Sequence, residues 1–241
     1  MKKITKLGPG TIFNYAKEKF VVLEQMEDGA LCLLAQSKDS VPFHRDGGDF
    51  PNNYGMSTLK KDIEGPWLDN LIANGAKRSD LVPFDVDLRQ SDGSFGYGML
   101  KGVYAASLTL WQYGKYKDII PLNEDDWWWL VTPLYVKTPG SPYCLSSVGS
   151  TLALNVDYNG GWGGSGCSDA YGIRPALKLN SCLSVSLDGD DEEEKDGECD
   201  NYHVDLARVD TLTLIREVER RLSEPVICEE PDECGCEVEQ Q

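Results

Sequence analysis

Short runs of apolar residues, separated by turn-forming residues, run through positions 1–187 and predict short strands and short helices. Residues 20–23 (Phe-Val-Val-Leu) and 30–35 (Ala-Leu-Cys-Leu-Leu-Ala) are two such runs. They flank the pair Asp28-Gly29, which favours a tight turn between antiparallel strands. The sequence therefore predicts a β-hairpin over this region.

A helical spacing of apolar residues begins after Ser57, whose hydroxyl is suited to cap a helix. The apolar positions that follow are Leu59, Ile63, Trp67, Leu68, Leu71 and Ile72. Gly65-Pro66 interrupts this pattern, so we expect two short helices instead of one. Another helical turn is predicted after Thr109, which is again a capping residue.

Residues 127–133 (Trp-Trp-Trp-Leu-Val-Thr-Pro) predict a strand, and residues 171–179 (Tyr-Gly-Ile-Arg-Pro-Ala-Leu-Lys-Leu) predict a closing strand. Alternation along a strand places Trp127 and Trp129 on one side and Trp128 on the other. We interpret the three tryptophans as structural core residues first, with the alternative that one of these two groups reaches the surface. Arg174 is also interpreted as structural, because a buried guanidinium needs a carboxylate or carbonyl partner.

Residues 135–171, between these strands, are predicted to form loops rich in Gly, Ser, Asn, Asp, Tyr and Trp. Tyrosine and tryptophan contribute large contact areas at low entropic cost, and the small polar residues supply adaptable hydrogen bonds. We therefore expect a binding surface here, with a solvated loop of an ordinary fold as the alternative. The candidate ligand-binding residues are Asn155, Asp157, Tyr158, Asn159, Trp162, Ser165, Asp169 and Tyr171.

The chain beyond residue 187 predicts three further segments. Residues 188–204 form an acidic linker, which like charges keep extended. Residues 205–224 predict an amphipathic helix, because Leu206, Val209, Leu212, Ile215, Val218 and Leu222 recur every three or four positions. One short helix is not stable alone, so we expect residues 205–222 to mediate self-association or docking to an assembly. Residues 225–241 are expected to be disordered.

Charge disfavours two classes of partner. The chain has a net charge of −17, but residues 1–187 hold 18 basic and 20 acidic residues, a net of −2, so the acidity lies in the tail. Neither part offers the basic surface that nucleic acids require. No apolar run approaches the roughly 18 residues that a membrane-spanning helix needs. Since no signal-peptide pattern follows Met1, we expect a cytoplasmic protein, or a virion-associated one if a phage encodes it.

The sequence offers little for catalysis or metal binding. Residues 161–166 match the dinucleotide pattern Gly-x-Gly-x-x-Gly, but no helix is expected to follow, so we interpret them as a flexible display loop. The chain has two histidines, His44 and His203, and no hydrolase, metalloprotease or P-loop motif. The cysteines of the tail lack the paired zinc-finger spacing. We predict no cofactor, and we assign no calcium site to Asp85, Asp87, Asp92, Asp125 and Asp126, whose spacing is not that of an EF-hand.

Several motifs in this order resemble a known family. They are residues 20–23, 57–60 (Ser-Thr-Leu-Lys), 109–113 (Thr-Leu-Trp-Gln-Tyr), 128–133 and 172–177 (Gly-Ile-Arg-Pro-Ala-Leu). Together they resemble the bacterial and phage domain family DUF6273, over about residues 11–187. The resemblance implies an α+β, C-type-lectin-like fold, similar to formylglycine-generating enzymes and to the diversified binding proteins of phages. Val131 departs from the family, which often has Arg at this position.

Three functional hypotheses follow. The first is a non-enzymatic module in which loops 135–171, displayed on a rigid lectin-like scaffold, bind a protein or a glycan. The second is a structural virion or tail component without a specific loop ligand. The third, implied by the resemblance, is a copper-thiolate oxidase that uses Cys144 with Cys167 or Cys182.

Overall fold

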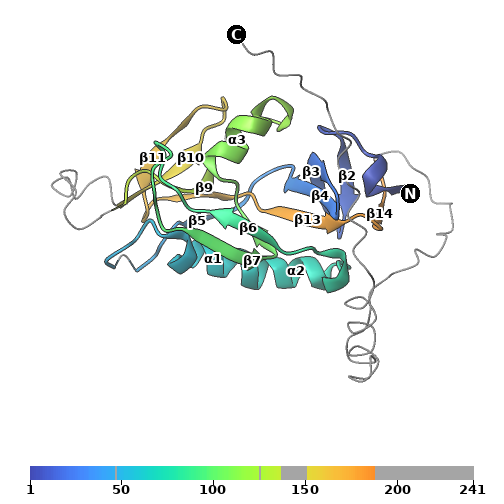
Figure 1. Cartoon of the computed structure of the whole chain (residues 1–241), viewed down its shortest axis with the longest axis horizontal. Coiled ribbons are helices and arrows are strands. Elements are labelled where there is room, and N and C mark those ends of the chain that lie inside the picture. Colours follow the sequence, from blue (N-terminus) through green and yellow to red (C-terminus); the bar gives the residue numbers. More distant parts are fainter. Residues whose placement is uncertain (47, 125, 137–150, 188–241) are drawn as a thin grey trace, which may run out of the picture. The chain divides into compact units, whose positions relative to one another are not determined.

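Two five-stranded β-sheets form the framework of this α+β chain, whose computed structural model describes residues 1–46, 48–124, 126–136 and 151–187 (Figure 1). The tryptophan sheet has the order β11-β10-β9-β12-β5 and contains β5 (Lys38–Pro42), β9 (Trp128–Pro133), β10 (Leu152–Val156), β11 (Trp162–Gly166) and β12 (Ala170–Ile173). The N-terminal sheet has the order β2-β3-β4-β13-β8 and contains β2 (Ile12–Tyr15), β3 (Glu18–Met26), β4 (Gly29–Leu34), β8 (Ala105–Ala106) and β13 (Ala176–Asn180). The linker 188–204, the helix 205–224 and the tail 225–241 lie outside the described residues.

Smaller elements complete the described chain. Two-stranded sheets pair β1 (Lys2–Lys3) with β14 (Ser184–Val185), and β6 (Phe84–Asp87) with β7 (Met99–Val103). The α-helices are α1 (Thr58–Asp62), α2 (Leu68–Ala73) and α3 (Leu110–Tyr116). The single turns are η1 (Ile4–Lys6), η2 (Tyr54–Met56), η3 (Ile63–Trp67), η4 (Arg78–Asp80) and η5 (Lys117–Ile119). Within these described segments, no helix is long and apolar enough to cross a membrane.

Capping hydroxyls begin the helices where the sequence predicts. Ser57 Oγ accepts a hydrogen bond from the backbone N–H of Lys60 at 3.0 Å, and α1 starts at the next residue. Thr109 and Gln112 cap α3 reciprocally. Gly65-Pro66 lies in the π-helical turn η3, and Gly65 has non-helical angles (φ −103°, ψ −105°). The predicted division into two helices is confirmed, although they remain joined through this turn.

The closing segment 171–179 is not the single strand expected from its apolar pattern. β12 belongs to the tryptophan sheet, where it pairs with β5 and β9. β13 belongs to the N-terminal sheet, where it pairs with β4 and β8. Arg174 and Pro175 connect the two strands, and proline has no N–H to continue a ladder. This segment therefore joins the two sheets.

A β-hairpin occupies much of the region that was predicted to be loops. β10 pairs with β11 in an antiparallel register from Leu152↔Gly166 to Val156↔Trp162. The glycine-rich residues 161–166 are therefore mostly an edge strand, and their interpretation as a flexible display loop was wrong. A Cβ at Gly164 would lie 3.0 Å from the side chain of Leu134, so a larger residue would need that side chain to shift. Composition alone does not distinguish such a strand from a loop.

The tryptophan sheet is covered on both faces (Figure 1). Trp129 and Val131 face one core cluster, which contains Leu59, Ile63, Leu68 and Leu71 from the α1–α2 segment. Trp128 and Leu130 face the other cluster, which contains Leu110, Tyr113 and Tyr116 from α3. Because side chains alternate along β9, this strand contributes residues to both core clusters. At one end of the first face the aromatic residues extend to the surface.

Candidate functional site

An open cleft of about 470 Å³ lies where β5 and β12 meet the residue that precedes β9. Its lining residues come from three segments: Ser37, Asp39 and Ser40; Trp127; and Ala170, Tyr171 and Gly172. A volume of this size falls within the range of about 300–1,000 Å³ that is usual for small-molecule sites. The cleft therefore has an aromatic wall, formed by Trp127 and Tyr171, and a polar lip, formed by Ser37, Asp39 and Ser40.

The aromatic wall is the outer end of a continuous series of ring contacts. The Trp127 ring stacks on Tyr171, with centroids 5.7 Å apart and an interplanar angle of 21°. Tyr171 in turn meets the buried Trp129 edge-on at 4.8 Å. The Tyr158 ring centroid lies 6.4 Å from that of Trp127, with the two rings tilted by 53°. Trp127 is 39% exposed and Tyr158 46% exposed, so a core series ends in two solvent-facing rings.

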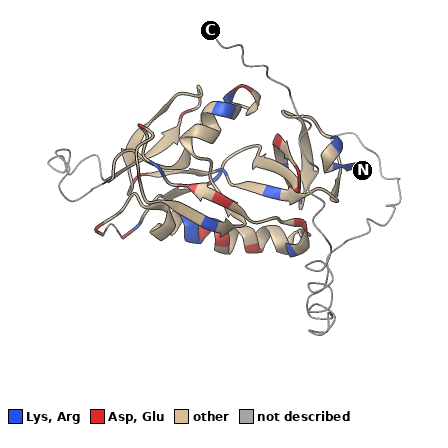
Figure 2. Cartoon of the chain, viewed as in Figure 1, with Lys and Arg blue, Asp and Glu red and all other residues tan. Residues whose placement is uncertain are grey.

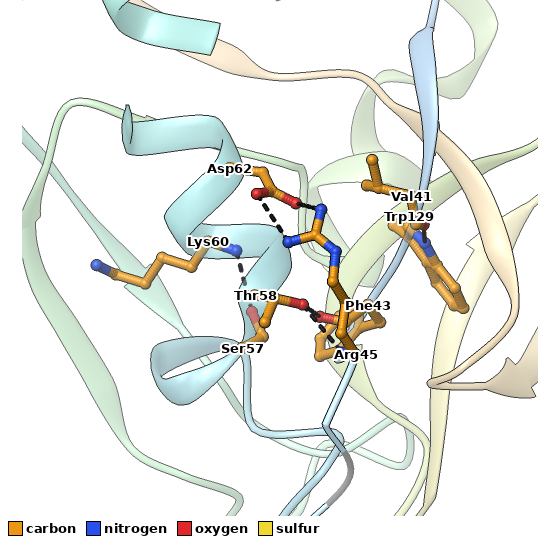
Figure 3. Close-up of polar contacts among 8 residues, drawn as sticks. All are labelled: Val41, Phe43, Arg45, Ser57, Thr58, Lys60, Asp62 and Trp129. Atoms are coloured by element: carbon orange, nitrogen blue, oxygen red, sulfur yellow. Dashed lines mark hydrogen bonds and ion pairs between the residues drawn. The ribbon is translucent and has the colours of Figure 1, made fainter. Parts of the chain in front are cut away.

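Trp129 fixes the inner end of this series. Its Nε1 donates a hydrogen bond to the backbone carbonyl of Val41 at 2.8 Å, and its ring contacts Phe43 edge-on at 5.5 Å (Figure 3). The segment after β5 is tied to α1, because the backbone N–H of Arg45 donates to Thr58 Oγ1 at 3.1 Å and the Arg45 guanidinium pairs with Asp62. Trp129, which supports the aromatic wall, is therefore bonded to β5, and the segment that follows β5 is bonded to α1.

Gly172 allows the floor of the cleft to form. Its backbone N–H donates to the carbonyl of Trp127 at 2.8 Å, which joins β12 to the start of β9. A Cβ at Gly172 would lie 2.6 Å from Ser37 Oγ and 3.0 Å from that same carbonyl. Such approaches are shorter than van der Waals contact, so only glycine fits. This residue brings the serine lip next to Trp127.

The lip contains a β-bulge at Asp39. Gly172 pairs with Ser40 and Ile173 pairs with Lys38, which leaves Asp39 as the additional residue on β5. Its φ of 43° is in the left-handed region, which aspartate adopts more readily than most residues. Bulges bend a strand and redirect side chains, and they are frequent beside functional sites. Here the bulge places Asp39 in the cleft lining.

The polar groups of the lip are unpaired within the described residues. The side chains of Ser37, Asp39 and Ser40 make no hydrogen bond or ion pair with any residue of those segments. Asp39 is the one charged residue in the lining. The sequences of β9, β10, β11 and β12 contain no Lys, Arg, Asp or Glu, and Figure 2 shows β9, β10 and β11 in tan. Among the residues that line the cleft, Asp39 thus provides the one charge.

A short polar network lies behind Tyr171. Asn155 Nδ2 donates to Ser165 Oγ at 2.6 Å, and Ser165 Oγ donates to the Tyr171 hydroxyl at 3.1 Å. Asn155 is only 2% exposed. Two residues predicted to bind ligand therefore orient Tyr171 from within, and Tyr171 itself lines the cleft.

Two of the predicted aspartates stabilise turns. Asp157 Oδ1 accepts hydrogen bonds from the backbone N–H groups of Asn159 (2.8 Å) and Gly161 (2.9 Å). Asp169 Oδ2 accepts from the backbone N–H of Gly166 at 2.9 Å. Asn159 and Trp162 are exposed, Trp162 by 54%, but neither lines the cleft. The turn that carries Tyr158 is also held by α3, because the Tyr113 hydroxyl donates to the carbonyl of Gly160 at 2.7 Å.

The structure changes the assignment of Trp127, which the sequence places in the core. Trp128 and Trp129 are 1% and 0% exposed, whereas Trp127 forms the wall of the cleft. The alternation of faces does predict that Trp127 and Trp129 share one side. It does not predict that the core ends between them. The lip residues carry no sequence signal, because two serines and one aspartate resemble any polar loop.

Arg174 is buried in the connection between β12 and β13. Its Nε donates to the carbonyl of Leu34 at 2.8 Å, and Nη2 donates to the carbonyls of Ala35 and Pro121. Nη1 lies 3.6 Å from the carboxylate of Asp126. Burial lowers the pKa of Arg174 to about 10, and the Asp126 carboxylate opposes this shift. The guanidinium remains charged at neutral pH and links the β12–β13 connection to two other backbone segments.

The remaining candidate groups are the cysteines of the oxidase hypothesis and the aspartates considered for calcium. Burial raises the pKa of the Cys167 thiol to about 12, which disfavours its thiolate at neutral pH, whereas Cys182, the other proposed thiol, is partly exposed. Their proposed partner Cys144 lies outside the described residues. Asp85 pairs with Lys101 and Asp87 with Arg89. Apart from the undescribed positions, which include Asp125, no group of three or more His, Cys, Asp and Glu residues could hold a metal ion.

Comparisons with known proteins found no match: no family model, no curated protein and no solved structure is similar to this chain.

Proposed function

We propose that this chain is a non-enzymatic binding module that recognises a protein or a glycan through the surface around Trp127. The observation that carries this proposal is the aromatic series that runs from the buried Trp129 through Tyr171 to the exposed Trp127 and Tyr158. Large aromatic side chains that remain exposed beside unpaired polar groups are typical of interaction sites.

The support beneath Trp127 favours recognition over a mobile surface. A ring that stacks on a neighbour and is backed by a buried core loses little conformational freedom when a ligand binds. Tyr171 supplies that backing and is itself held by Trp129 and Ser165. The binding surface is therefore formed before the ligand arrives.

For the fold, we propose the C-type-lectin-like architecture of the DUF6273-type family. The motifs that carry the resemblance lie in β3, α1, α3, β9 and the β12–β13 segment, in that order. Short strands, short helices and the junction at Arg174 support this proposal. The surface around Trp127 would then be displayed by a scaffold that tolerates variation in its connections.

The function is tested by ligand capture from bacterial envelopes and lysates. The double variant Trp127→Ala/Tyr158→Ala should lose at least about tenfold of the captured material, since aromatic anchors commonly contribute more than about 1.4 kcal/mol. Trp111→Ala is the matched control, because Trp111 is an equally exposed tryptophan (47%) on α3. All three proteins must melt at the same temperature. Equal capture by the double variant would refute the proposal and favour a structural component.

A further inference from the structure

We infer that the cleft beside Trp127 binds a neutral pyranose unit of a glycan. This inference rests on the proposed binding function and narrows the ligand to one chemical class. The observation that carries it is that one cleft is lined both by the partly exposed indole of Trp127 and by hydroxyl and carboxylate groups that have no partner in the described chain. A sugar ring presents complementary groups, with C–H bonds on one face and hydroxyls at its edge.

The indole wall suits the apolar face of a sugar ring. The C–H hydrogens of that face carry partial positive charge, and they meet the negative face of an aromatic ring favourably. The Trp127 ring lies at an angle of 21° to the Tyr171 ring behind it, so the pair forms a platform. Tyr158 contacts Trp127 at a tilt of 53° and does not itself line the cleft.

The lip suits the hydroxyl groups of the ring. Ser37 and Ser40 each provide a donor and acceptors, and Asp39 provides two acceptor oxygens. A site built to hydrogen-bond hydroxyls discriminates strongly, because a ligand that lacks them leaves the protein groups unpaired. The bulge at Asp39 and the glycine at 172 hold this lip next to the indole.

The charge of the cleft excludes the acidic sugars. Asp39 is the one charged lining residue, and an anionic uronate or sialate would face its carboxylate without any basic residue to compensate. The neighbouring Lys38 pairs with Glu18 at 3.0 Å. Neutral sugars, which need no counter-charge, fit this environment.

The ring geometry also argues against a small organic cation as the ligand. A cation is bound best when several aromatic faces surround it. Here Trp127 and Tyr171 are stacked on each other, so their facing surfaces are not open to a third group. A pair of stacked rings with hydroxyl groups nearby therefore fits a pyranose ring better than a small organic cation.

A glycan array followed by calorimetric titration of the selected oligosaccharides tests the inference on the full chain. The array should contain neutral hexose, N-acetylhexosamine and uronate glycans, and choline is titrated separately. We expect neutral glycans to bind, and Trp127→Ala to weaken that binding at least about tenfold, a change of about 1.4 kcal/mol. Trp127→Tyr should restore part of it, since a tyrosine keeps an aromatic face. Trp111→Ala should change the dissociation constant less than about twofold.

Three results would overturn the inference: no neutral glycan bound, uronates or choline bound in preference, or equal affinities for Trp127→Ala and Trp111→Ala. A failure of the glycan assignment can be distinguished from a failure of the proposed binding function. Material captured in a Trp127-dependent manner that protease destroys and periodate spares would identify a protein ligand. That outcome would support the proposed binding function and refute the glycan assignment.

Discussion

Replacement of Arg174 by methionine is expected to lower the free energy of unfolding by about 3–5 kcal/mol, because the substitution removes one partner of a buried charge pair. The Asp126 carboxylate, which is 7% exposed, would lose its cationic neighbour. The carbonyls of Leu34, Ala35 and Pro121 would each lose the hydrogen bond from the guanidinium, and the Ala35 carbonyl would keep the one from Asn123 Nδ2. Denaturant unfolding monitored by tryptophan fluorescence measures the change directly.

Two further variants make this prediction specific. Arg174→Lys keeps the charge but lacks the planar fork that reaches several carbonyls, so it should also be destabilised, by a smaller amount. Arg89→Met removes an exposed arginine that pairs with Asp87, and it should cost less than about 1 kcal/mol. A loss below about 1 kcal/mol for Arg174→Met would show that the junction between the sheets does not depend on this side chain.

Trp129→Ala is the second substitution with a large expected effect. The indole is fully buried between Phe43 and Tyr171, and its removal should cost about 3–5 kcal/mol. Trp129→Phe keeps most of the ring and leaves the Val41 carbonyl without its donor, so it should cost about 1–3 kcal/mol. Thermal unfolding of the two variants and the unchanged chain gives both values.

Trp129 also connects stability to the binding surface. Loss of its ring removes the support for Tyr171, on which Trp127 stacks. Trp129→Phe keeps an aromatic ring beneath Tyr171, so we expect it to weaken ligand capture less than Trp127→Ala does, although it lowers the free energy of unfolding more. If Trp129→Phe weakened capture more than Trp127→Ala, Trp127 would not be the residue that contacts the ligand, and the buried Trp129 would determine the shape of the cleft.

Periodic and capping signals predicted much of the fold. The hairpin around Asp28-Gly29, the helix starts at Ser57 and Thr109, and the strand of residues 127–133 are all confirmed. These features depend on neighbours within a few residues. The division of 171–179 between two sheets was not predicted, because both halves have the same apolar pattern and only tertiary pairing separates them. The β10–β11 hairpin was not predicted because its glycines resemble a loop.

The candidate site was less predictable than the fold. Tyr171 was among the predicted residues and lines the cleft, whereas Asn155 and Ser165 act from behind it. Trp127 and the lip residues are almost ninety positions apart in sequence, and the β5–β12–β9 pairing brings them together. A bulge such as that at Asp39 depends on the register of two strands. No local pattern of one strand reveals that register.

The central claim, that Trp127 is the contact residue of a binding surface, is tested most directly by fluorine NMR of the chain labelled with 5-fluorotryptophan. The six tryptophans give six resonances, which single Trp→Phe variants assign. On addition of a soluble bacterial envelope extract, the account predicts that the Trp127 resonance shifts or broadens while that of Trp111 stays unchanged. A Trp127 resonance that is unaffected by every extract, or that moves no more than Trp111, would contradict it.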